Sequence, residues 1–170
     1  KKRGGSHGAA EAPMQLDITV RQAKGLKHAG SHSVELRLDG HGALRTPWVE
    51  DEYDYDGDRV DGKNFQHCRV INLYQDEAKY QHAWLHITVL HQRFIMQDKR
   101  AAEAHVPFEQ LAKGFSGWVT LEHKSRYGGK LLIAAGLTQR HRAQAPAAQR
   151  EPESARPAAA PGGGAPQPQA

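Results

Sequence analysis

The stretch "MQLDITVR", residues 14–21, decides the fold class of this chain. Its apolar residues Met14, Leu16, Ile18 and Val20 alternate with polar residues. Because successive side chains of an extended strand point to opposite faces, the alternation gives one apolar and one polar face. The stretch therefore predicts a half-buried β-strand at the start of a folded domain.

The same alternation recurs along most of the chain that follows. It is clear in residues 33–38, 84–90, 118–121 and 130–137, and weaker in residues 43–50, 65–73 and 103–106. With the first stretch these segments make eight short strands, separated by turns rich in Gly, Asp, Ser and Pro. That spacing predicts one all-β domain over residues 14–138, an antiparallel eight-stranded β-sandwich.

Two local features depart from simple alternation. In residues 65–73 the apolar side chains change face after Val70, and a β-bulge would reconcile the two halves. The one helical piece that we expect is a turn or two in "FEQLAKG", with Pro107 before it and Gly114 at its end.

The two ends of the chain differ from the middle in composition. Residues 1–13 and 139–170 hold few large apolar residues, and the second segment is rich in Ala, Pro, Gly and Gln. Such segments bury too little apolar surface to offset the entropy of ordering, so we predict that both are disordered. The sequence lacks an initial Met, and we expect it to be a segment of a longer protein.

The net charge of +4 hides an uneven distribution. Residues 50–61 carry seven carboxylates and one arginine, whereas residues 14–138 as a whole are neutral. The rest of the domain is therefore basic, and the negative charge is concentrated in this one segment. The two regions would attract partners of opposite charge.

Cysteine and hydropathy point to an intracellular, cytoplasmic protein. Cys68 is the only cysteine, so no disulfide framework exists and a reducing compartment fits best. No run approaches the roughly 18 apolar residues that a membrane-spanning helix needs. We expect a cytoplasmic location, with peripheral attachment to a membrane or to the cytoskeleton as an option.

Three segments together resemble a C2 domain. Residues 16–38, "LDITVRQAKGLKHAGSHSVELRL", are similar to the first two strands of that family. Residues 84–124 resemble its second half, and "GGKLLIAAGL", residues 128–137, its closing strand. The resemblance implies a β-sandwich that binds partners and is not an enzyme. An immunoglobulin-like sandwich is the competing reading, but its Cys-Trp-Cys spacing is absent.

The resemblance also indicates that no calcium is bound. Calcium-binding members place aspartates where this chain has Ser31, His91 and Arg93, and Asp98 alone does not supply the six to eight oxygens that calcium takes. We therefore predict a module with a degenerate metal site.

Residues 50–64 form an acidic insertion relative to that family. Asp54, Asp56 and Asp58 imitate the start of an EF-hand loop, but Arg59 and Phe65 stand where that loop needs Gly and Glu. We expect a solvated loop that docks on something basic. Its candidate residues are Asp51, Glu52, Asp54, Asp56, Asp58 and Asp61.

An apolar triplet, Phe94, Ile95 and Met96, lies between basic residues in another predicted loop. One interpretation is a plug that folds back onto the domain. The other is an exposed tip that enters a bilayer interface or a pocket of a partner. The candidate tip residues are Arg93, Phe94, Ile95, Met96, Lys99 and Arg100.

Neither a metal site nor a catalytic site is expected. Of the eleven histidines, His82 and His86 have a spacing that suits a helix, but on a strand they lie about 13 Å apart. Ser125 lies near His123, yet sequence neighbours on a strand or turn do not make a triad. The sequence predicts no cofactor.

Two hypotheses for function remain open at this stage. The first is a calcium-independent protein-docking module within a larger scaffold, trafficking or cytoskeletal protein. The alternative is a calcium-independent module that binds anionic phospholipid. No nucleic-acid partner is expected in either case.

Overall fold

The computed structural model describes residues 13–140. The predictions of disorder for residues 1–13 and 139–170 therefore lie almost wholly outside the described residues. At the second boundary, residue 139 is part of the last strand, one residue beyond the predicted end of the domain.

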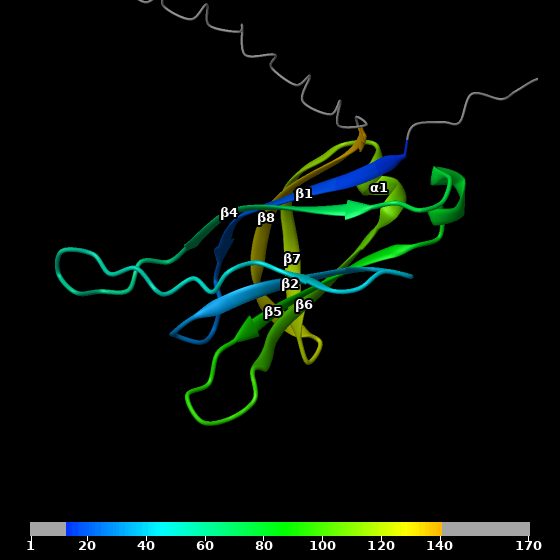
Figure 1. The fold of residues 1–170 in the computed structure, drawn as a ribbon. Helices are drawn as coiled ribbons and strands as arrows, with labels where there is room; N and C mark the ends of the chain where they lie inside the picture. Colours follow the sequence, from blue (N-terminus) through cyan, green and yellow to red (C-terminus); the bar gives the residue numbers. More distant parts are fainter. Residues whose placement is uncertain (1–12, 141–170) are drawn as a thin grey trace, which may run out of the picture. The chain divides into compact units, whose positions relative to one another are not determined.

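Eight strands and two short helices make up the described chain (Figure 1). In order they are β1 (Met14–Lys24), β2 (His32–Leu38), β3 (Leu44–Arg45), β4 (Lys63–Asn72), the 3-10 helix η1 (Glu77–Tyr80), β5 (Trp84–His91), β6 (Lys99–Pro107), α1 (Phe108–Ala112), β7 (Phe115–His123) and β8 (Arg126–Gln139).

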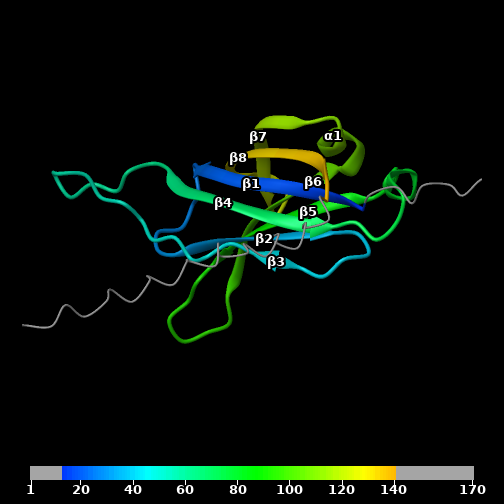
Figure 2. The same ribbon diagram turned by 45° about the horizontal axis from the view of Figure 1, so that its top comes forward.

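The strands are hydrogen-bonded in the order β3-β2-β5-β6-β7-β8-β1-β4, and every pair is antiparallel. Only one registered pair, Glu103 with Glu122, joins β6 to β7. The sheet folds on itself at this weak junction, so that β4, β1, β8 and β7 form one layer and β3, β2, β5 and β6 the other (Figure 2). The predicted antiparallel β-sandwich is confirmed.

The core is made of the side chains that the alternation predicted to point inward. Leu16, Ile18 and Val20 of β1 are fully buried, as are Leu36 of β2 and Ile87 of β5. Each buried apolar side chain of this size contributes about 1.5–3 kcal/mol relative to an exposed one. Burial of these alternating residues is therefore what fixes the register of the strands.

The strand predicted over residues 43–50 is wrong in extent. The structure has only Leu44–Arg45 as β3 and one isolated bridge between His32 and Val49. Pro47 lacks an N–H and interrupts the ladder. The hydroxyl of Thr46 accepts a hydrogen bond from the N–H of Val34 at 2.9 Å and helps to hold the break against β2.

The bulge predicted in residues 65–73 is present, but near the start of that segment and not after Val70. The register between β1 and β4 shifts between Val20 and Gln22, and Gln66 on β4 has φ of 43°. Beyond this bulge Ile71 faces the core while Val70 is exposed.

The helical turn predicted in residues 108–114 is confirmed as α1, which follows Pro107 directly. The 3-10 helix η1 has no counterpart in the prediction. Its residue Tyr80 is buried and packs against Phe108 of α1, with ring centroids 5.3 Å apart. The two short helices therefore close the same end of the core.

Three connections emerge at the opposite end of the sandwich from α1 and η1 (Figure 1). We name them loop 1 (residues 25–31), loop 2 (residues 46–62) and loop 3 (residues 92–98). The start of β2 is tied to loop 2, because the His32 N–H donates to the Val49 carbonyl at 2.9 Å. Loop 1 is tied to loop 3, because the Gln92 N–H donates to the Ser31 carbonyl at 3.0 Å.

Candidate functional site

A buried lysine ties loop 1 to loop 2. The Nζ of Lys63 lies 2.6 Å from Oδ1 of Asp51 and donates hydrogen bonds to the carbonyls of Gly30 and Val49, at 2.5 Å and 3.3 Å. The side chains of Lys63 and Asp51 are only 5% and 6% exposed. An ammonium group has three donors, and here each of them has an oxygen acceptor.

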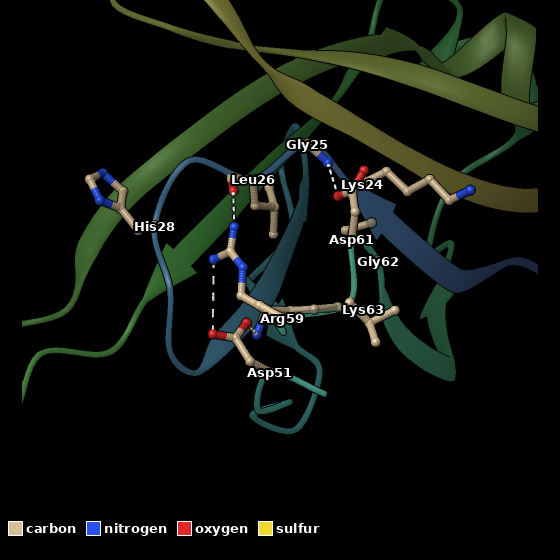
Figure 3. Close-up of a pocket in the computed structure, with 11 residues that line it drawn as sticks. Lys24, Gly25, Leu26, His28, Asp51, Arg59, Asp61, Gly62 and Lys63 are labelled. Carbon is tan, nitrogen blue, oxygen red and sulfur yellow. Dashed lines mark hydrogen bonds and ion pairs between the residues drawn. The ribbon is translucent and has the colours of Figure 1, made fainter. Parts of the chain in front are cut away.

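The Asp51 carboxylate completes this tie. Its Oδ2 accepts a hydrogen bond from the Gly30 N–H at 2.6 Å and lies 3.9 Å from Nη1 of Arg59 (Figure 3). Burial acts to raise the pKa of Asp51, but the hydrogen bonds from Lys63 and Gly30 and the charges of Lys63 and Arg59 outweigh it, so the pKa lies below its usual value. Asp51 is therefore ionised at neutral pH.

Two of the six residues predicted for the acidic docking loop thus have partners within the domain. Asp51 binds Lys63, and Oδ1 of Asp61 accepts a hydrogen bond from the Gly25 N–H at 3.0 Å (Figure 3). The insertion also ends earlier than predicted, because β4 begins at Lys63.

The other acidic residues lie on a projecting hairpin, residues 52–60. A bridge between Tyr53 and Arg59 closes it, and Asp54 holds the turn because its Oδ1 accepts the Asp58 N–H at 2.8 Å. All nine residues are exposed, and Tyr55 is fully exposed. The structure therefore leaves Glu52, Asp54, Asp56 and Asp58 on the solvent side.

The apolar triplet of loop 3 points into solvent. Phe94 and Ile95 are fully exposed and Met96 is 67% exposed. The alternative interpretation, a plug folded back on the domain, is wrong. The side chain of Met96 stays within its own loop, where its Sδ lies 3.5 Å from Nη1 of Arg93.

Basic side chains surround the base of this tip. Arg93 and Lys99 are half-buried, and Arg100 is exposed, 4.0 Å from Glu103. Loop 1 adds Lys27 and His28 to the same region. The rings of His28 and His91 stack with their centroids 5.2 Å apart. Burial, and then the charges of His91, Lys99, Lys27 and His123, lower the pKa of His28.

The positions that the family resemblance assigned to calcium ligands have other partners. Nε2 of His91 lies 2.8 Å from the Ala29 carbonyl, and Asp98 lies 4.0 Å from Arg45. Ser31 is half-buried and uses its carbonyl to accept from Gln92. His91 and Ser31 thus join loop 1 to β5 and loop 3, and Asp98 faces β3.

His32 is buried directly beneath loop 1. Its Nδ1 lies 3.1 Å from the Gly30 carbonyl, and its Nε2 has no hydrogen-bond partner among the described residues. Burial, followed by the charges of Lys63 and His91, lowers the pKa of His32 to about 4. His32 is therefore neutral at physiological pH.

A second polar cluster lies on the outer face of the β2–β5–β6 layer. His86 and His105 are directly opposite each other on β5 and β6, with their Nδ1 atoms 2.8 Å apart. Nε2 of His86 lies 2.7 Å from Oδ1 of Asp39. The backbone N–H of Trp84, and then His86, lower the pKa of Asp39, so this carboxylate is ionised. The sequence prediction missed this cluster, because only the pairing of β5 with β6 brings the two histidines together.

The described residues contain neither a metal cluster nor a membrane-spanning helix. Between residues 13 and 140, no group of three or more His, Cys, Asp or Glu side chains is arranged to hold a metal ion. Over the same residues, no helix has the length and hydropathy needed to cross a membrane. The serine considered for catalysis, Ser125, lies in the tight turn between β7 and β8 with φ of 60°.

Sequence comparisons are negative: no protein-family model matches the chain, and no curated protein is significantly similar to it. Solved structures do match in fold. The first C2 domain of a plant extended synaptotagmin 1 superposes with a TM-score of 0.61 at 11% identity, over 78% of this chain and 99% of that domain.

Two further structures support the same conclusion. A pair of C2 domains from extended synaptotagmin 2, solved with calcium bound, gives a TM-score of 0.56 at 14% identity, over 79% of this chain and 46% of that one. Human GIVD cytosolic phospholipase A2 gives 0.58 at 12% identity, over 78% of this chain but only 17% of the enzyme. At such low identity the likeness concerns the fold alone. Residues 13–140 therefore form a β-sandwich with the fold of C2 domains.

Proposed function

We propose that this domain is a calcium-independent module that docks on anionic membranes from the cytoplasm through the tip of loop 3. The observation that carries the proposal is the full exposure of Phe94 and Ile95 at the apex of a loop with basic residues at its base. Large apolar side chains exposed together at such a position are typical of an interaction site.

Lys63 supports the calcium-independent part of the proposal. Its ammonium group lies among oxygens of Gly30, Val49 and Asp51, where a cation that joined loops 1 and 2 would find its ligands. A divalent cation would have to displace a paired, buried ammonium group. The loops are thus already joined by a positive charge that belongs to the chain itself.

The composition of the tip supports a membrane as the partner. Transfer of Phe94 and Ile95 from water to an apolar phase would contribute about 1.5–3 kcal/mol each. Basic residues near an anionic surface contribute about 1 kcal/mol each, and Arg93, Lys99 and Arg100 flank the triplet. Together these terms suffice for reversible, peripheral binding without a spanning segment.

The test is sedimentation of the full chain with vesicles of phosphatidylserine and phosphatidylcholine, and with vesicles of phosphatidylcholine alone. Binding should require the anionic lipid, weaken at higher salt, and stay the same with calcium or with a chelator. The double variant Phe94→Ser, Ile95→Ser should bind more than tenfold more weakly, since about 3 kcal/mol or more of apolar transfer is lost.

A matched control is Tyr74→Ser, which removes an 82% exposed aromatic ring from the connection between β4 and η1. That connection lies at the end of the sandwich away from loop 3 (Figure 1). Tyr74→Ser should bind like the unchanged chain. Equal vesicle binding by the loop 3 double variant, or a requirement for calcium, would refute the proposal.

A second candidate function, docking of a basic protein, rests on the acidic hairpin. Residues 52–60 present exposed Tyr53 and Tyr55 between carboxylates, and aromatic side chains are enriched at protein interfaces. On this alternative the domain is part of a larger scaffold or trafficking protein. Neutralising the hairpin should strengthen binding to an anionic membrane and weaken binding to a basic protein, so one charge variant separates the two functions.

A further inference from the structure

We propose that His86 and His105 form a binding site for a divalent transition-metal ion that prefers nitrogen ligands, such as Cu²⁺ or Ni²⁺. The site lies on the outer face of the β2–β5–β6 layer, on strands and not on the loops. It is independent of the membrane-docking proposal, since it shares no residue with loop 3.

The hydrogen bond to Asp39 sets the tautomer of His86. Oδ1 of Asp39 lies 2.7 Å from Nε2 of His86, and because a carboxylate only accepts, Nε2 carries the proton. In the neutral ring, Nδ1 of His86 is then the acceptor nitrogen and directs its lone pair toward His105. Histidine ligands of metals have this arrangement, in which the second ring nitrogen donates to a carboxylate.

The spacing of the two nitrogens matches two adjacent ligands of one metal ion. The Nδ1 atoms of His86 and His105 are 2.8 Å apart. Two nitrogens that each bind a metal at about 2.0–2.1 Å lie about 2.9 Å apart if the angle between them is 90°, and about 3.3 Å apart if it is tetrahedral. In the metal-free chain this separation is that of a hydrogen bond, which the Nδ1–H of His105 donates to Nδ1 of His86. A metal ion would replace that proton between two nitrogens already held at nearly ligand spacing, and imidazole nitrogen suits both Cu²⁺ and Ni²⁺.

The backbone holds this pair in place before any metal arrives. His86 and His105 are registered partners in a continuous ladder between β5 and β6. Asp39 is fixed in turn, because its Oδ2 accepts the Trp84 N–H at 2.9 Å and its own N–H donates to the Trp84 carbonyl at 3.1 Å. For metal binding, Nδ1 of His105 must release its proton, with Nε2 carrying the ring proton instead, and the exposed ring must turn so that both lone pairs meet at one point.

Two nitrogens make an incomplete ligand set, in agreement with the absence of any three-residue metal cluster among residues 13–140. The other positions of the metal would be taken by water, since His105 is exposed and His86 is 27% exposed. Hard cations such as Ca²⁺ and Mg²⁺ prefer oxygen ligands and would not bind here.

The test is calorimetric titration of the full chain with Cu²⁺ and with Ni²⁺, together with the electron paramagnetic resonance spectrum of bound Cu²⁺. The variant His105→Asn should bind Cu²⁺ at least tenfold more weakly, and the nitrogen couplings of a two-imidazole site should disappear. Asp39→Asn should also weaken binding, because loss of a carboxylate behind a ligand costs about 10–100-fold in metal affinity.

The matched control is His82→Asn, which removes an exposed histidine that lies outside the pair. It should bind Cu²⁺ like the unchanged chain, and all three variants should keep the melting temperature of the metal-free chain. Unchanged affinity in His105→Asn, or an equal loss in His82→Asn, would overturn the proposal. So would a preference for Ca²⁺ over Cu²⁺.

Discussion

Lys63 illustrates how a single buried charge joins two loops. Moving an ammonium group out of water costs several kcal/mol, and the cost is recovered only if every donor finds an acceptor. Here the acceptors are the carboxylate of Asp51 and the carbonyls of Gly30 and Val49. The result is a fixed cross-link between loops 1 and 2 that needs no ligand from solution.

The first prediction concerns this cross-link. Lys63→Met should lower the free energy of unfolding by about 3 kcal/mol or more, because it leaves the buried Asp51 carboxylate without its main partner. Urea denaturation of the single and double variants measures the effect. In Lys63→Met, Asp51→Asn the loss should be smaller than the sum of the two single losses, since both charges are gone. Additive losses would show that the pair is not coupled.

The second prediction concerns His32 and pH. The pKa of His32 is about 4 in the folded chain and about 6.5 when unfolded, so between these values the unfolded state binds more protons. Above pH 6.5 His32 is neutral in both states and costs the fold nothing. As the pH falls from 6.5 toward 4, the free energy of unfolding falls by about 3 kcal/mol, because the unfolded chain gains a proton that the folded chain does not. His32→Phe should flatten this part of the stability curve, as measured by denaturation at several pH values. An unaltered slope would contradict the assignment.

At the scale of elements, β8 contains a close approach that only glycine allows. Gly129 has φ of 110°, and a Cβ there would lie 2.7 Å from the carbonyl oxygen of Lys24 on β1. Gly136, farther along the same strand, has no atom within 4 Å of a built Cβ. Gly129 is thus required where β8 approaches the end of β1, whereas Gly136 is not required for space.

The third prediction follows from this contrast. Gly129→Ala should lower the free energy of unfolding by about 3 kcal/mol, from backbone strain and overpacking together. Gly136→Ala should change it by less than about 1 kcal/mol, and a gain is expected from the stiffer unfolded chain. Thermal or urea denaturation of the two variants compares them directly. Equal effects would show that the close approach to Lys24 relaxes easily.

Strand positions could be predicted from the sequence because burial follows a period of two. The inward residues of β1, β2 and β5 were identified in this way. A break in the period indicated that β4 contains a bulge, but its position at Gln66 depends on the pairing with β1 and could not be read from β4 alone. The strand over residues 43–50 was overestimated because alternation was given more weight than Pro47.

The candidate sites were predictable only where they are local in sequence. The tip of loop 3 is a contiguous triplet between basic residues, so it could be found. The pair His86–His105 joins residues 19 positions apart through the pairing of β5 with β6. The tie between Lys63 and Asp51 joins residues 12 positions apart through the path of loop 2. No spacing rule along the chain reveals such contacts before the register is known.

At the scale of the whole domain, the loop end carries charge of both signs. The basic residues near loops 1 and 3 surround the apolar tip, whereas the exposed carboxylates lie on the hairpin of loop 2. The hairpin and loop 3 project in different directions (Figures 1 and 2). The two candidate surfaces are therefore separate. Because they share one end of the sandwich, the negative charges of the hairpin still affect the binding of an anionic surface at loop 3.

The last prediction uses this separation to decide between the two functions. Asp54→Asn, Asp56→Asn and Asp58→Asn together remove three charges from the hairpin, and Asp61 is left intact because it accepts the Gly25 N–H. The new amide at position 54 keeps an oxygen for the turn, so the melting temperature should stay the same or rise slightly. Repulsion between the hairpin and an anionic surface falls, so vesicle binding should strengthen, most clearly below about 0.1 M salt.

Docking of a basic protein requires the reverse. If the hairpin is the contact surface, the same triple variant should associate more slowly and more weakly with a lysine- and arginine-rich peptide, because charge complementarity mainly sets the association rate. Vesicle sedimentation and peptide binding, measured on this one variant, therefore separate the two functions. Stronger vesicle binding with unchanged peptide binding would support loop 3 as the functional surface, and weaker peptide binding would support the hairpin. No change in either would show that the hairpin has no part in binding.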